Sequence, residues 1–498
     1  MSPTSRVDVT CDTRAASWSY VTKPDFLRLD RAIGAVMASA VGDALGAGYE
    51  FVTAPSPDNV VMRPGTLTHE PAGHWTDDTA MALAVVEVAA SRGTLLSDDA
   101  LDDVAQRFLD WYRSGPLDVG NQTRAVLSRA ATSSELRAVA LEVLADDPTR
   151  AGNGSLMRTG PVALAHLGSD AELARAASLI SALTHPNPLA IDACVLWTIA
   201  IDRAIRLASL EGPRAGLPMI DAERRDQWAE WIDEAEANDP RRFSPNGFVV
   251  RALQAAWSAI YATREEPQHL VAALRRCVSI GDDTDTVAAI AGALLGARYG
   301  VSSVPFAWRF GLAGWPRQYR FCDLLRLAVL AARGGEDDDQ GWPSTTSLSD
   351  YYRQFSPTGL VATFPVDDAV TFGDVASLPG STADVVISLC RVGLDDVPAL
   401  ENELVWLLDD DGNADVARVL ADTADGIAWL RQRGKSVFVH CVRAESRTPA
   451  VAMAWLIRHH GRSVDDAIAE VSAAMSTCRP HPSLLKGVRE SSTLPPFA

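Results

Sequence analysis

The chain has 498 residues, of which 47% are hydrophobic and 22% charged. This apolar content excludes a mostly disordered chain, and the length predicts two or three domains. The formal net charge is −19, which repels phosphate backbones and argues against general nucleic-acid binding.

Cysteine usage and the N-terminal residues bear on the compartment. The seven cysteines are scattered along the chain and odd in number, so they form no disulfide framework, and we expect a reducing compartment. Residues 1–20 are polar and lack the apolar segment of a secretory signal. No apolar run approaches the ~18 residues that span a bilayer. These features predict a cytoplasmic protein with no membrane partner.

Residues 27–333 have the pattern of consecutive helices. Alanine, leucine, valine and arginine dominate, and apolar residues recur at spacings typical of one helix face. This pattern predicts an all-α domain, larger than a four-helix bundle, after an N-terminal tail at 1–26. The clearest helices are expected at residues 31–45, 79–91, 100–112, 189–207, 249–263 and 287–299.

The composition then changes. Residues 334–341 are acidic and flanked by glycines, which is typical of a linker, and we place one at 334–349. From residue 350 to 498, short β-type runs alternate with helical segments, and this alternation predicts a smaller α/β domain. Its clearest elements are strands at 384–389 and 436–440 and helices at 416–431 and 449–460.

Two acidic motifs open apolar helices in the first domain. They are Thr-Asp-Asp-Thr at 76–79 and Gly-Asp-Asp-Thr-Asp-Thr at 281–286. Helix capping alone accounts for one such motif, because aspartate and threonine favour helix N-termini. Two motifs that lead into helices apolar all round indicate buried carboxylates, and several of these together require a cation. Oxygen ligands without histidine or cysteine favour Mg²⁺ over zinc.

Further segments of the first domain are compatible with the same site. A Gly-studded turn at 42–50 ends in Glu50, and the glycines of the loop at 152–158 allow a ligand to approach backbone amides. His185 lies in a Thr-His-Pro turn, and residues 120–123 (Gly-Asn-Gln-Thr) form a weaker candidate. Taken alone, each of these segments is more often structural than functional.

The order of these motifs resembles the ADP-ribosylglycohydrolase family, and within it the bacterial, dinitrogenase-reductase-activating-like branch that reverses mono-ADP-ribosylation of arginine. The resemblance implies an all-α fold and two bound Mg²⁺ ions. The metal ligands that it implies are Glu50, Thr76, Asp77, Asp78, Asp283, Asp285 and Thr286. The ADP-ribose contacts that it implies are Asn153, Gly154, Ser155 and His185, with Asn121 as the weaker candidate.

The resemblance also implies a mechanism. The metal ions would hold ribose hydroxyls and orient a water at the anomeric carbon, and carboxylates such as Asp77 and Asp285 would stabilise the oxocarbenium character of the transition state. The expected partner is an ADP-ribosylated protein, with arginine as the favoured linkage. A hydrolase of another ADP-ribosyl conjugate and a non-catalytic binding protein are the alternatives. Asp282 stands where the family usually has a small residue, so it either supports the ligands or is solvated.

The second domain contains a cysteine loop at 437–448. A strand ends at His440, Cys441 follows, and Thr448-Pro449 opens a helix. The spacing from Cys441 to Arg447 is weak evidence alone, but a strand, loop and helix in this order let backbone amides cradle a phosphate. The same positive field favours a thiolate nucleophile, and an arginine binds phosphate with two hydrogen bonds.

This segment resembles the dual-specificity branch of the protein tyrosine phosphatases. By that resemblance Cys441 is the nucleophile, Arg447 binds the phosphate and Thr448 assists the leaving thiolate. The general acid is expected at Asp410, with Asp409 and Asp411 as alternatives.

The loop departs from the phosphatase pattern in one position. Ala444 occupies a place where the family has glycine, and Glu445 adds a negative charge. Three interpretations remain open. They are a phosphatase acting on a phosphorylated protein or small molecule, a phosphate-binding reader without turnover, and a structural remnant.

Overall fold

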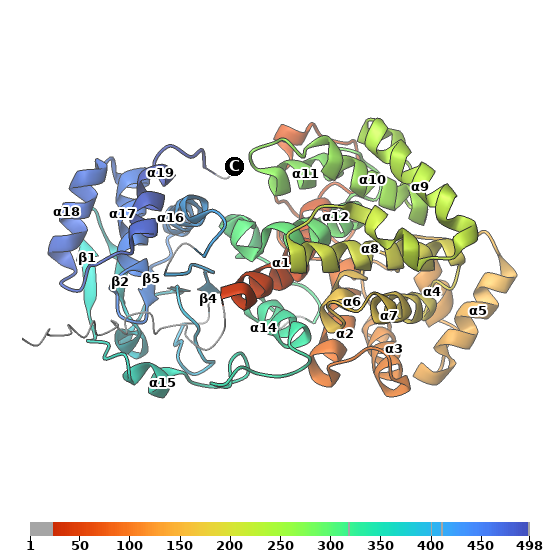
Figure 1. Cartoon of the computed structure of the whole chain (residues 1–498), viewed down its shortest axis with the longest axis horizontal. Coiled ribbons are helices and arrows are strands. Elements are labelled where there is room, and N and C mark those ends of the chain that lie inside the picture. The colour runs from red at the N-terminus through yellow and green to blue at the C-terminus, as the bar shows by residue number, and fades with distance from the viewer. Residues whose placement is uncertain (1–22, 317–318, 400, 410–411, 497–498) are drawn as a thin grey trace, which may run out of the picture.

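The computed structural model describes residues 23–316, 319–399, 401–409 and 412–496. A large helical region lies beside a smaller region that contains the sheet (Figure 1). All six helices singled out in the sequence are confirmed, as parts of α1, α2, α3, α8, α10 and α12. The helical region contains α1 (Lys23–Gly46), α2 (Asp77–Arg92), α3 (Asp98–Arg113), α4 (Asn121–Leu127), α5 (Leu136–Asp146), α6 (Gly160–Ala165), α7 (Asp170–Ala182), α8 (Pro188–Leu207), α9 (Ala222–Ala237), α10 (Val249–Ala262), α11 (His269–Val278), α12 (Thr284–Tyr299), α13 (Phe306–Arg309) and α14 (Phe321–Ala332).

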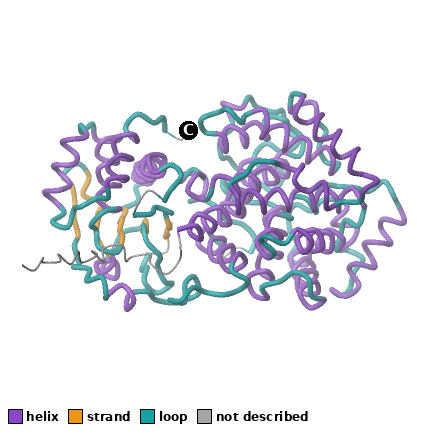
Figure 2. Tube along the Cα trace, viewed as in Figure 1, coloured by secondary structure: helices purple, strands orange, loops and turns teal. Residues whose placement is uncertain are grey.

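The C-terminal region has the expected α/β architecture, and Figure 2 shows its strands gathered at one end of the molecule. The expected strands are confirmed as β3 and β5, and the expected helices as α16 and α17. The elements are α15 (Ser349–Arg353), β1 (Val361–Phe364), β2 (Asp367–Asp374), β3 (Val385–Ser388), β4 (Glu401–Leu404), α16 (Val416–Gln432), β5 (Val437–Cys441), α17 (Arg447–His460), α18 (Val464–Ala474) and α19 (Pro482–Ser491).

Helices α1 and α12 pack with their backbones almost in contact. Small residues recur every fourth position along α1, and a Cβ added at Gly34 would lie 2.3 Å from the Gly296 carbonyl oxygen. At the other end, a Cβ added at Gly46 would lie 2.4 Å from the Cα of Asp285. The two helices are therefore antiparallel, and the C-terminal end of α1 meets the first turn of α12.

The sheet has the order β1-β2-β5-β3-β4, with β1 antiparallel to β2 and the other pairs parallel. Alternate residues along a strand point to opposite faces. Val385 and Ile387 pack in a core with α16 and α17, whereas Val386 packs in the core of the helical region. One hydrophobic core therefore continues from the helices onto the sheet.

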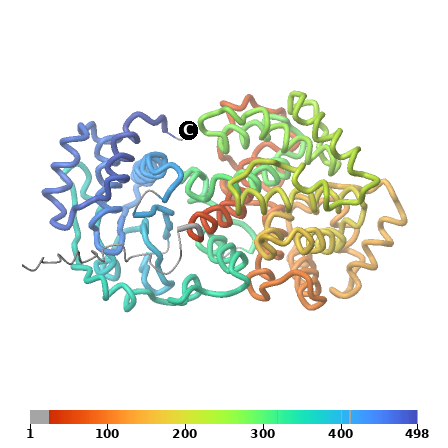
Figure 3. The backbone as a smooth tube through the Cα atoms, viewed as in Figure 1, coloured from red at the N-terminus to blue at the C-terminus, as the bar shows by residue number. Residues whose placement is uncertain are grey.

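The segments expected as a tail and as a linker both pack against the α/β region. Residues 23–26, expected in the tail, form the first turn of α1, and the Phe26 ring lies 5.7 Å from the Trp406 ring. In Figure 3 the same end of α1, in red, reaches the blue backbone of the second region. Within the expected linker, Asp338 is buried and forms an ion pair with Arg391.

In the part of the chain that the structure describes, no helix combines the length and apolar character needed to cross a bilayer.

Candidate functional site

Acidic residues from distant parts of the sequence meet at one buried point in the helical region. The end of α1 and the turn after it supply Asp43 and Glu50, and the first turns of α2 and α12 supply Asp78 and Asp285. The exposed fractions of these four residues are 0%, 6%, 1% and 2% in that order. The antiparallel contact between α1 and α12 brings the end of α1, which carries Asp43, beside the first turn of α12, which carries Asp285.

The carboxylates form two groups that share Asp285. One ligand oxygen from each of Asp43, Asp78 and Asp285 lies within 4.8 Å of the others, and the same is true of Glu50, Asp283 and Asp285. Asp77 is in neither group, and its Oδ2 accepts a hydrogen bond from the Gly120 amide at 3.4 Å.

Threonine hydroxyls lie among these carboxylates. The Thr76 hydroxyl is 2.9 Å from Asp43 Oδ1 and 3.2 Å from both Asp78 Oδ2 and Asp285 Oδ2. Thr286 Oγ1 lies 3.4 Å from Asp78 Oδ2. A hydroxyl has one proton to donate, so these threonines leave most of the carboxylate charge uncompensated.

Sequence reasoning did not identify Asp43 as part of the site. Its carboxylate accepts hydrogen bonds from the Thr76 and Thr79 amides, both at 2.9 Å, and from the hydroxyls of the same two threonines. Asp43 therefore fixes the first turn of α2, which carries Asp77 and Asp78. The available signal was a single acid inside an apolar helix, between Gly42 and Gly46.

The cluster is strongly self-repulsive. Burial, followed by the charges of Asp118 and Asp283, raises the pKa of Glu50 to about 9. Burial and the Asp118 carboxylate also raise the pKa of Asp77 to about 8. The pKa values of Asp78 and Asp285 lie well above the usual range for the same reason, burial first and neighbouring carboxylates second. Asp118, in the loop after α3, had no motif that pointed to it.

The donor set fits divalent cations. Asp78 Oδ1 is buried and has no hydrogen-bond partner among the described residues. Carboxylate and hydroxyl oxygens are the ligands that hard ions such as Mg²⁺ prefer. A bound cation would remove the cost of burying these charges together.

The loop at 152–158 approaches this cluster from one side. The Asn153 side-chain amide donates to Asp283 Oδ2 at 2.7 Å. A Cβ on Gly154 would lie 3.1 Å from the His185 ring, so glycine lets the loop pass against it. Burial, followed by the charge of Arg158, holds the pKa of His185 well below its usual range, so the ring is neutral.

The remaining ADP-ribose candidates are placed differently. The Ser155 hydroxyl is buried and accepts a hydrogen bond from Ser181 Oγ at 3.0 Å. Asn121 is exposed at the start of α4, whereas its neighbour Gln122 accepts from the Gly152 amide and donates to the Thr184 carbonyl, both at 3.2 Å. Gln122 therefore ties the loop to the histidine turn, a role that the sequence did not indicate.

Asp282 points away from the carboxylate cluster. Its backbone is left-handed, with φ of 61°, and its side chain accepts a hydrogen bond from the Ser244 hydroxyl. The adjacent Asp283 is held instead by Asn246, whose Oδ1 accepts from the Asp283 amide at 3.1 Å.

A second constellation surrounds the end of β5 in the α/β region. Cys441 is the last residue of β5, and Arg447 is the first residue of α17. Both side chains are buried, and Arg447 Nη1 donates to the Leu389 carbonyl at 2.6 Å. Burial acts to lower the pKa of Arg447, but the nearby Cys441 and Asp409 outweigh it and the pKa is raised. The arginine thus stays charged beside the thiol.

The side chains of His440 and Thr448, next to the cysteine loop, form contacts with residues outside the loop. Burial lowers the pKa of His440 to about 4, and its Nε2 lies 2.8 Å from the Ser388 hydroxyl. The Thr448 hydroxyl lies 3.4 Å from the Gly373 carbonyl oxygen. Asp410 and Asp411 lie outside the described residues, whereas Asp409 is described and its Oδ1 is a buried atom without a hydrogen-bond partner among described residues.

The loop between β5 and α17 is anchored by the segment that joins α18 to α19. Thr477 Oγ1 donates to the Ala444 carbonyl at 2.8 Å, and the Arg479 amide donates to the Glu445 carbonyl at 2.6 Å. Ala444 has φ of 49°, so an alanine occupies the left-handed region that favours glycine. The Glu445 carboxylate pairs with Arg443 at 3.1 Å on the surface.

Comparison with known proteins assigns both regions to known classes. A family model described as ADP-ribosylglycohydrolase matches residues 24–339, and one described as dual specificity phosphatase, catalytic domain, matches residues 390–493. The first match assigns the helical region to a class of hydrolases, and its paired acidic turns form carboxylate groups that could hold metal ions. The chain belongs to the ADP-ribosylglycohydrolase family and carries a dual-specificity phosphatase-like domain after it.

Three similar proteins illustrate the relationship. The ADP-ribosyl-[dinitrogen reductase] glycohydrolase of Rhodospirillum rubrum is 31% identical over 287 residues, which cover 56% of this chain and 89% of that protein. The ADP-ribosylarginine hydrolase Tri1 of Pseudomonas putida (strain GB-1) is 32% identical, covering 56% of this chain and 73% of that protein. A solved structure titled "ADP-ribosylglycohydrolase-related protein complex" is 30% identical, with a TM-score of 0.51, and covers 62% of this chain and 99% of that one.

Proposed function

We propose that the helical region hydrolyses the glycosidic bond between ADP-ribose and an arginine side chain of a protein. The observation that carries this proposal is the buried carboxylate cluster, in which Asp78 keeps an oxygen without a hydrogen-bond partner among described residues. The names of two relatives, an ADP-ribosyl-[dinitrogen reductase] glycohydrolase and an ADP-ribosylarginine hydrolase, support the choice of bond.

Two divalent ions, with Mg²⁺ as our candidate, would be held by the oxygen atoms of the cluster. Two carboxylate groups that share Asp285 support two ion sites rather than one. Ions bound there would supply Lewis-acid contacts to hydroxyl groups and to a water molecule. The residues that we assign to them are Glu50, Thr76, Asp77, Asp78, Asp283, Asp285 and Thr286.

The chain itself supplies positioning and charge. Asn153 links the glycine loop to Asp283, so the loop and the carboxylates hold a fixed relative position. The neutral His185 ring packs on Gly154 and so holds the backbone of the loop in place. Carboxylates such as Asp77 would stabilise positive charge that develops at the anomeric carbon as the bond breaks.

Asp285→Asn tests this proposal. The substitution removes a charge common to both carboxylate groups, and we expect release of ADP-ribose from an arginine-ADP-ribosylated protein in Mg²⁺ to fall about 10²–10³-fold. Asp465→Asn, an exposed acid in the α/β region, is the matched control. Undiminished release by Asp285→Asn would contradict the assignment.

The linkage is tested with the same assay. The human ADP-ribosylhydrolase ARH3 is also similar, at 27% identity over 60% of this chain and 93% of that protein. Mass analysis of the products from arginine-linked and serine-linked peptides should show release from the arginine linkage. Release from the serine-linked peptide alone would assign this chain to another conjugate.

We further propose that the α/β region is a cysteine-dependent phosphatase. The pairing of a buried, charged Arg447 with Cys441 at a strand–loop–helix junction supports this activity over a structural remnant. The thiolate would attack phosphorus while an aspartic acid, Asp410 or its neighbours Asp409 and Asp411, donates a proton to the leaving oxygen, and water would then hydrolyse the cysteinyl phosphate. Thr448 would assist departure of the thiolate in this second step.

Cys441→Ser with p-nitrophenyl phosphate tests the phosphatase. We expect loss of at least about 10³-fold in turnover, whereas Cys478→Ser, a half-buried cysteine of the same region, should retain it. Asparagine substitutions at each of 409, 410 and 411 should identify the acid by a loss of about 10²–10⁴-fold. Binding of phosphate by a wild type that turns over no substrate would favour a reader instead.

A further inference from the structure

A buried arginine, Arg158, ends the glycine loop in the core of the helical region. Its side chain is 0% exposed, and its guanidinium lies over the Phe108 ring, 4.4 Å from the ring centroid. Its Nε forms no hydrogen bond with the described residues. Burial lowers the pKa of Arg158 to about 10, so the group is still charged near neutral pH. A buried charge is costly, and the contacts that it does form therefore call for a reason.

Those contacts lead to His185. Arg158 Nη2 donates to Thr184 Oγ1 at 2.6 Å, and Nη1 lies 3.4 Å from the sulfur of Met81. Thr184 Oγ1 in turn lies 2.7 Å from His185 Nδ1. Arg158, Thr184 and His185 thus form a hydrogen-bond chain that ends at one of the candidate ADP-ribose contacts.

The hydrogen-bond chain determines where the proton of His185 lies. A guanidinium only donates, so the Thr184 oxygen accepts from Arg158. Thr184 is 0% exposed, and among the described residues its hydroxyl proton has one acceptor within reach, Nδ1 of His185. A buried hydroxyl that lost this bond would keep an unpaired proton, which is costly. Nδ1 therefore accepts, and the neutral ring carries its proton on Nε2.

Nε2 of His185 faces the glycines of the loop. A Cβ added at Gly154 would lie 3.2 Å from Nε2, and a Cβ added at Gly152 would lie 3.6 Å from it. Thr123 Oγ1 borders the same space, 3.3 Å from the Cβ added at Gly154. His185 is 1% exposed, and within the described part of the chain its Nε2 forms no hydrogen bond. A buried N–H without an acceptor is costly, and the glycines leave room for a ligand to bring one.

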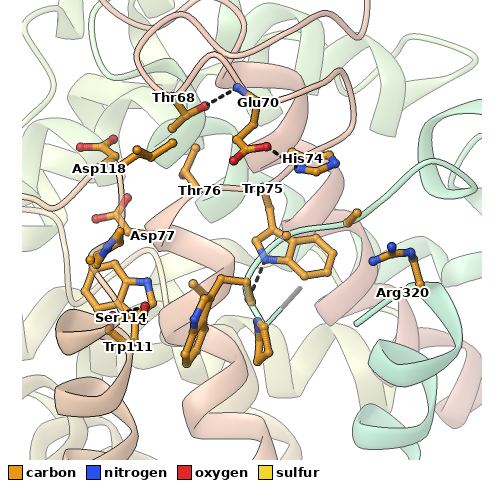
Figure 4. A pocket seen from close by; sticks show the side chains of 18 residues that line it. Thr68, Glu70, His74, Trp75, Thr76, Asp77, Trp111, Ser114, Asp118 and Arg320 are labelled. Carbon is orange, nitrogen blue, oxygen red and sulfur yellow. Dashed lines mark hydrogen bonds and ion pairs between the residues drawn. The ribbon is translucent and has the colours of Figure 1, made fainter. Parts of the chain in front are cut away.

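The acceptor belongs to the loop side of the carboxylate cluster. A cavity of about 590 Å³ also opens beside the cluster, where Asp77, Asp118 and the Trp111 ring line it (Figure 4). Among the described residues that line this cavity, none belongs to the hydrogen-bond chain. Nε2 therefore faces the loop rather than the cavity, and its acceptor would be part of the ligand that the loop binds.

We propose that Arg158 and Thr184 are positioning residues that hold the proton of His185 on Nε2, so that the ring donates a hydrogen bond to an acceptor oxygen of the ADP-ribosyl group. The proposal rests on the hydrolase function proposed above and adds to it the direction of one contact. A phosphate oxygen or a ribose hydroxyl accepts such a bond, whereas an ammonium group does not. The same tautomer excludes Nε2 as a proton acceptor in the reaction.

Nitrogen NMR of the full-length protein, labelled at histidine, tests the position of the proton. The signals that are missing from the spectrum of His185→Gln belong to His185. We expect Nε2 to show the shift and the one-bond coupling of a protonated nitrogen, and Nδ1 to show the shift of an unprotonated one. In Thr184→Val, Nδ1 loses its donor and the proton should distribute over both nitrogens, whereas Thr184→Ser should restore the wild-type signals. A proton on Nδ1 in the wild type would overturn the proposal.

Binding of ADP-ribose in Mg²⁺, measured by calorimetry, tests the donor role without requiring turnover. Thr184→Val and, in a separate protein, Arg158→Met should each weaken binding about tenfold or more. Thr184→Ser keeps the hydroxyl and should bind within about threefold of the wild type. Equal affinities for the wild type and Thr184→Val would overturn the proposal.

Thr198→Val is the matched control. Thr198 lies on α8 and is also 0% exposed, but its hydroxyl has no hydrogen-bond partner among the described residues. We expect this variant to bind ADP-ribose within about twofold of the wild type. Weakening as large as that of Thr184→Val would show that any such change in the core reduces binding, and would overturn the proposal.

Turnover separates this proposal from the proposed hydrolase. A protein that carries the proton on Nε2 and shows the expected affinities, but releases no ADP-ribose from any conjugate, would contradict the hydrolase and leave the positioning role standing. Release from an arginine conjugate by a protein that carries the proton on Nδ1 would do the reverse.

Discussion

The two candidate sites solve opposite electrostatic problems. In the helical region, helix first turns bring carboxylates together until Glu50 and Asp77 have strongly raised pKa values, a condition that a cation relieves. In the α/β region, Cys441 lies at the end of β5, next to the N-terminus of α17 and the charged Arg447. This positive charge favours a bound anion. The start of a helix therefore favours a cation where aspartate side chains line its first turn. It favours an anion where only the backbone amides face the site.

The largest expected effect is that a substitution in either site abolishes the activity of that site alone. Asp78→Asn removes a buried carboxylate of the cluster and should lower ADP-ribose release about 10²–10³-fold while leaving p-nitrophenyl phosphate hydrolysis within about twofold. Cys441→Ser should give the reverse pattern. Steady-state assays of both reactions on both variants measure this directly. If either variant lost both activities while remaining folded by circular dichroism, the two sites would not be independent.

A smaller effect is expected where the two regions meet. Arg309, 3% exposed, pairs with the buried carboxylates of Glu403 and Asp422. Arg309→Met leaves both carboxylates without their cation and should lower the free energy of unfolding by about 3–5 kcal/mol in urea titrations. Arg353→Met, which removes an ion pair with the highly exposed Asp350, should leave the urea midpoint unchanged. Equal midpoints for the two variants would mean that the buried cluster adds nothing to stability.

The acidic site also predicts a pH dependence in metal-free protein. Glu50 and Asp77 have folded-state pKa values of about 9 and about 8, above their ordinary values near 4. The folded state therefore holds protons that the unfolded state releases, so stability falls as the pH rises through 8 and 9. In EDTA we expect Tm to fall between about pH 6 and pH 9, because each of the two groups lowers the free energy of unfolding by up to about 1.4 kcal/mol per pH unit until the pH reaches its folded-state pKa.

Mg²⁺ should flatten that pH profile, because bound ions replace the protons of the cluster. Asp77→Asn, which removes one of the titrating groups, should reduce the slope in EDTA. A wild-type profile that is flat in EDTA would contradict the self-repulsion of the cluster.

The smallest effect concerns the cysteine loop. Ala444 adopts a left-handed backbone with φ of 49°, so Ala444→Gly should remove strain and raise stability by about 1 kcal/mol. Ala450→Gly, inside α17, should do the opposite by about the same amount. Thermal unfolding of the two variants measures both changes. A loss of stability in Ala444→Gly would show that the alanine methyl packs more favourably than its backbone is strained.

Sequence periodicity was sufficient to predict the long helices, because apolar residues recur along helices such as α8 and α10 at the spacing of one helix face. The strands β3 and β5 were predicted from their short apolar runs. The short edge strands β1 and β4 and helices α18 and α19 were not predicted, since brief half-buried segments carry little periodicity. The order of motifs also indicated the acidic cluster. It did not indicate Asp43, Gln122 or Asp118, because their roles depend on contacts between segments far apart in the chain.

Domain limits were harder to infer for the same reason. Residues 27–333 read as one unit in sequence, yet Phe306 packs in the core of the α/β region, and its amide donates to Asp422 at 2.9 Å. From there the chain continues to Ala313, whose carbonyl accepts a hydrogen bond from the Trp75 amide at 2.9 Å. Only the folded structure shows that this segment connects the α/β region to the turn before α2.

The packing of Phe306 in the α/β region determines how the protein behaves after proteolytic cleavage between its two regions. A protease cut within residues 334–349 would break the covalent connection, but α13 would remain embedded among α16 and its neighbours, with the ring of Phe306 against Gly426. The two fragments should migrate together on a sizing column and separate only in denaturant. The sequence changes composition at residues 334–349, but the packing of the α/β region extends back to Phe306 in α13.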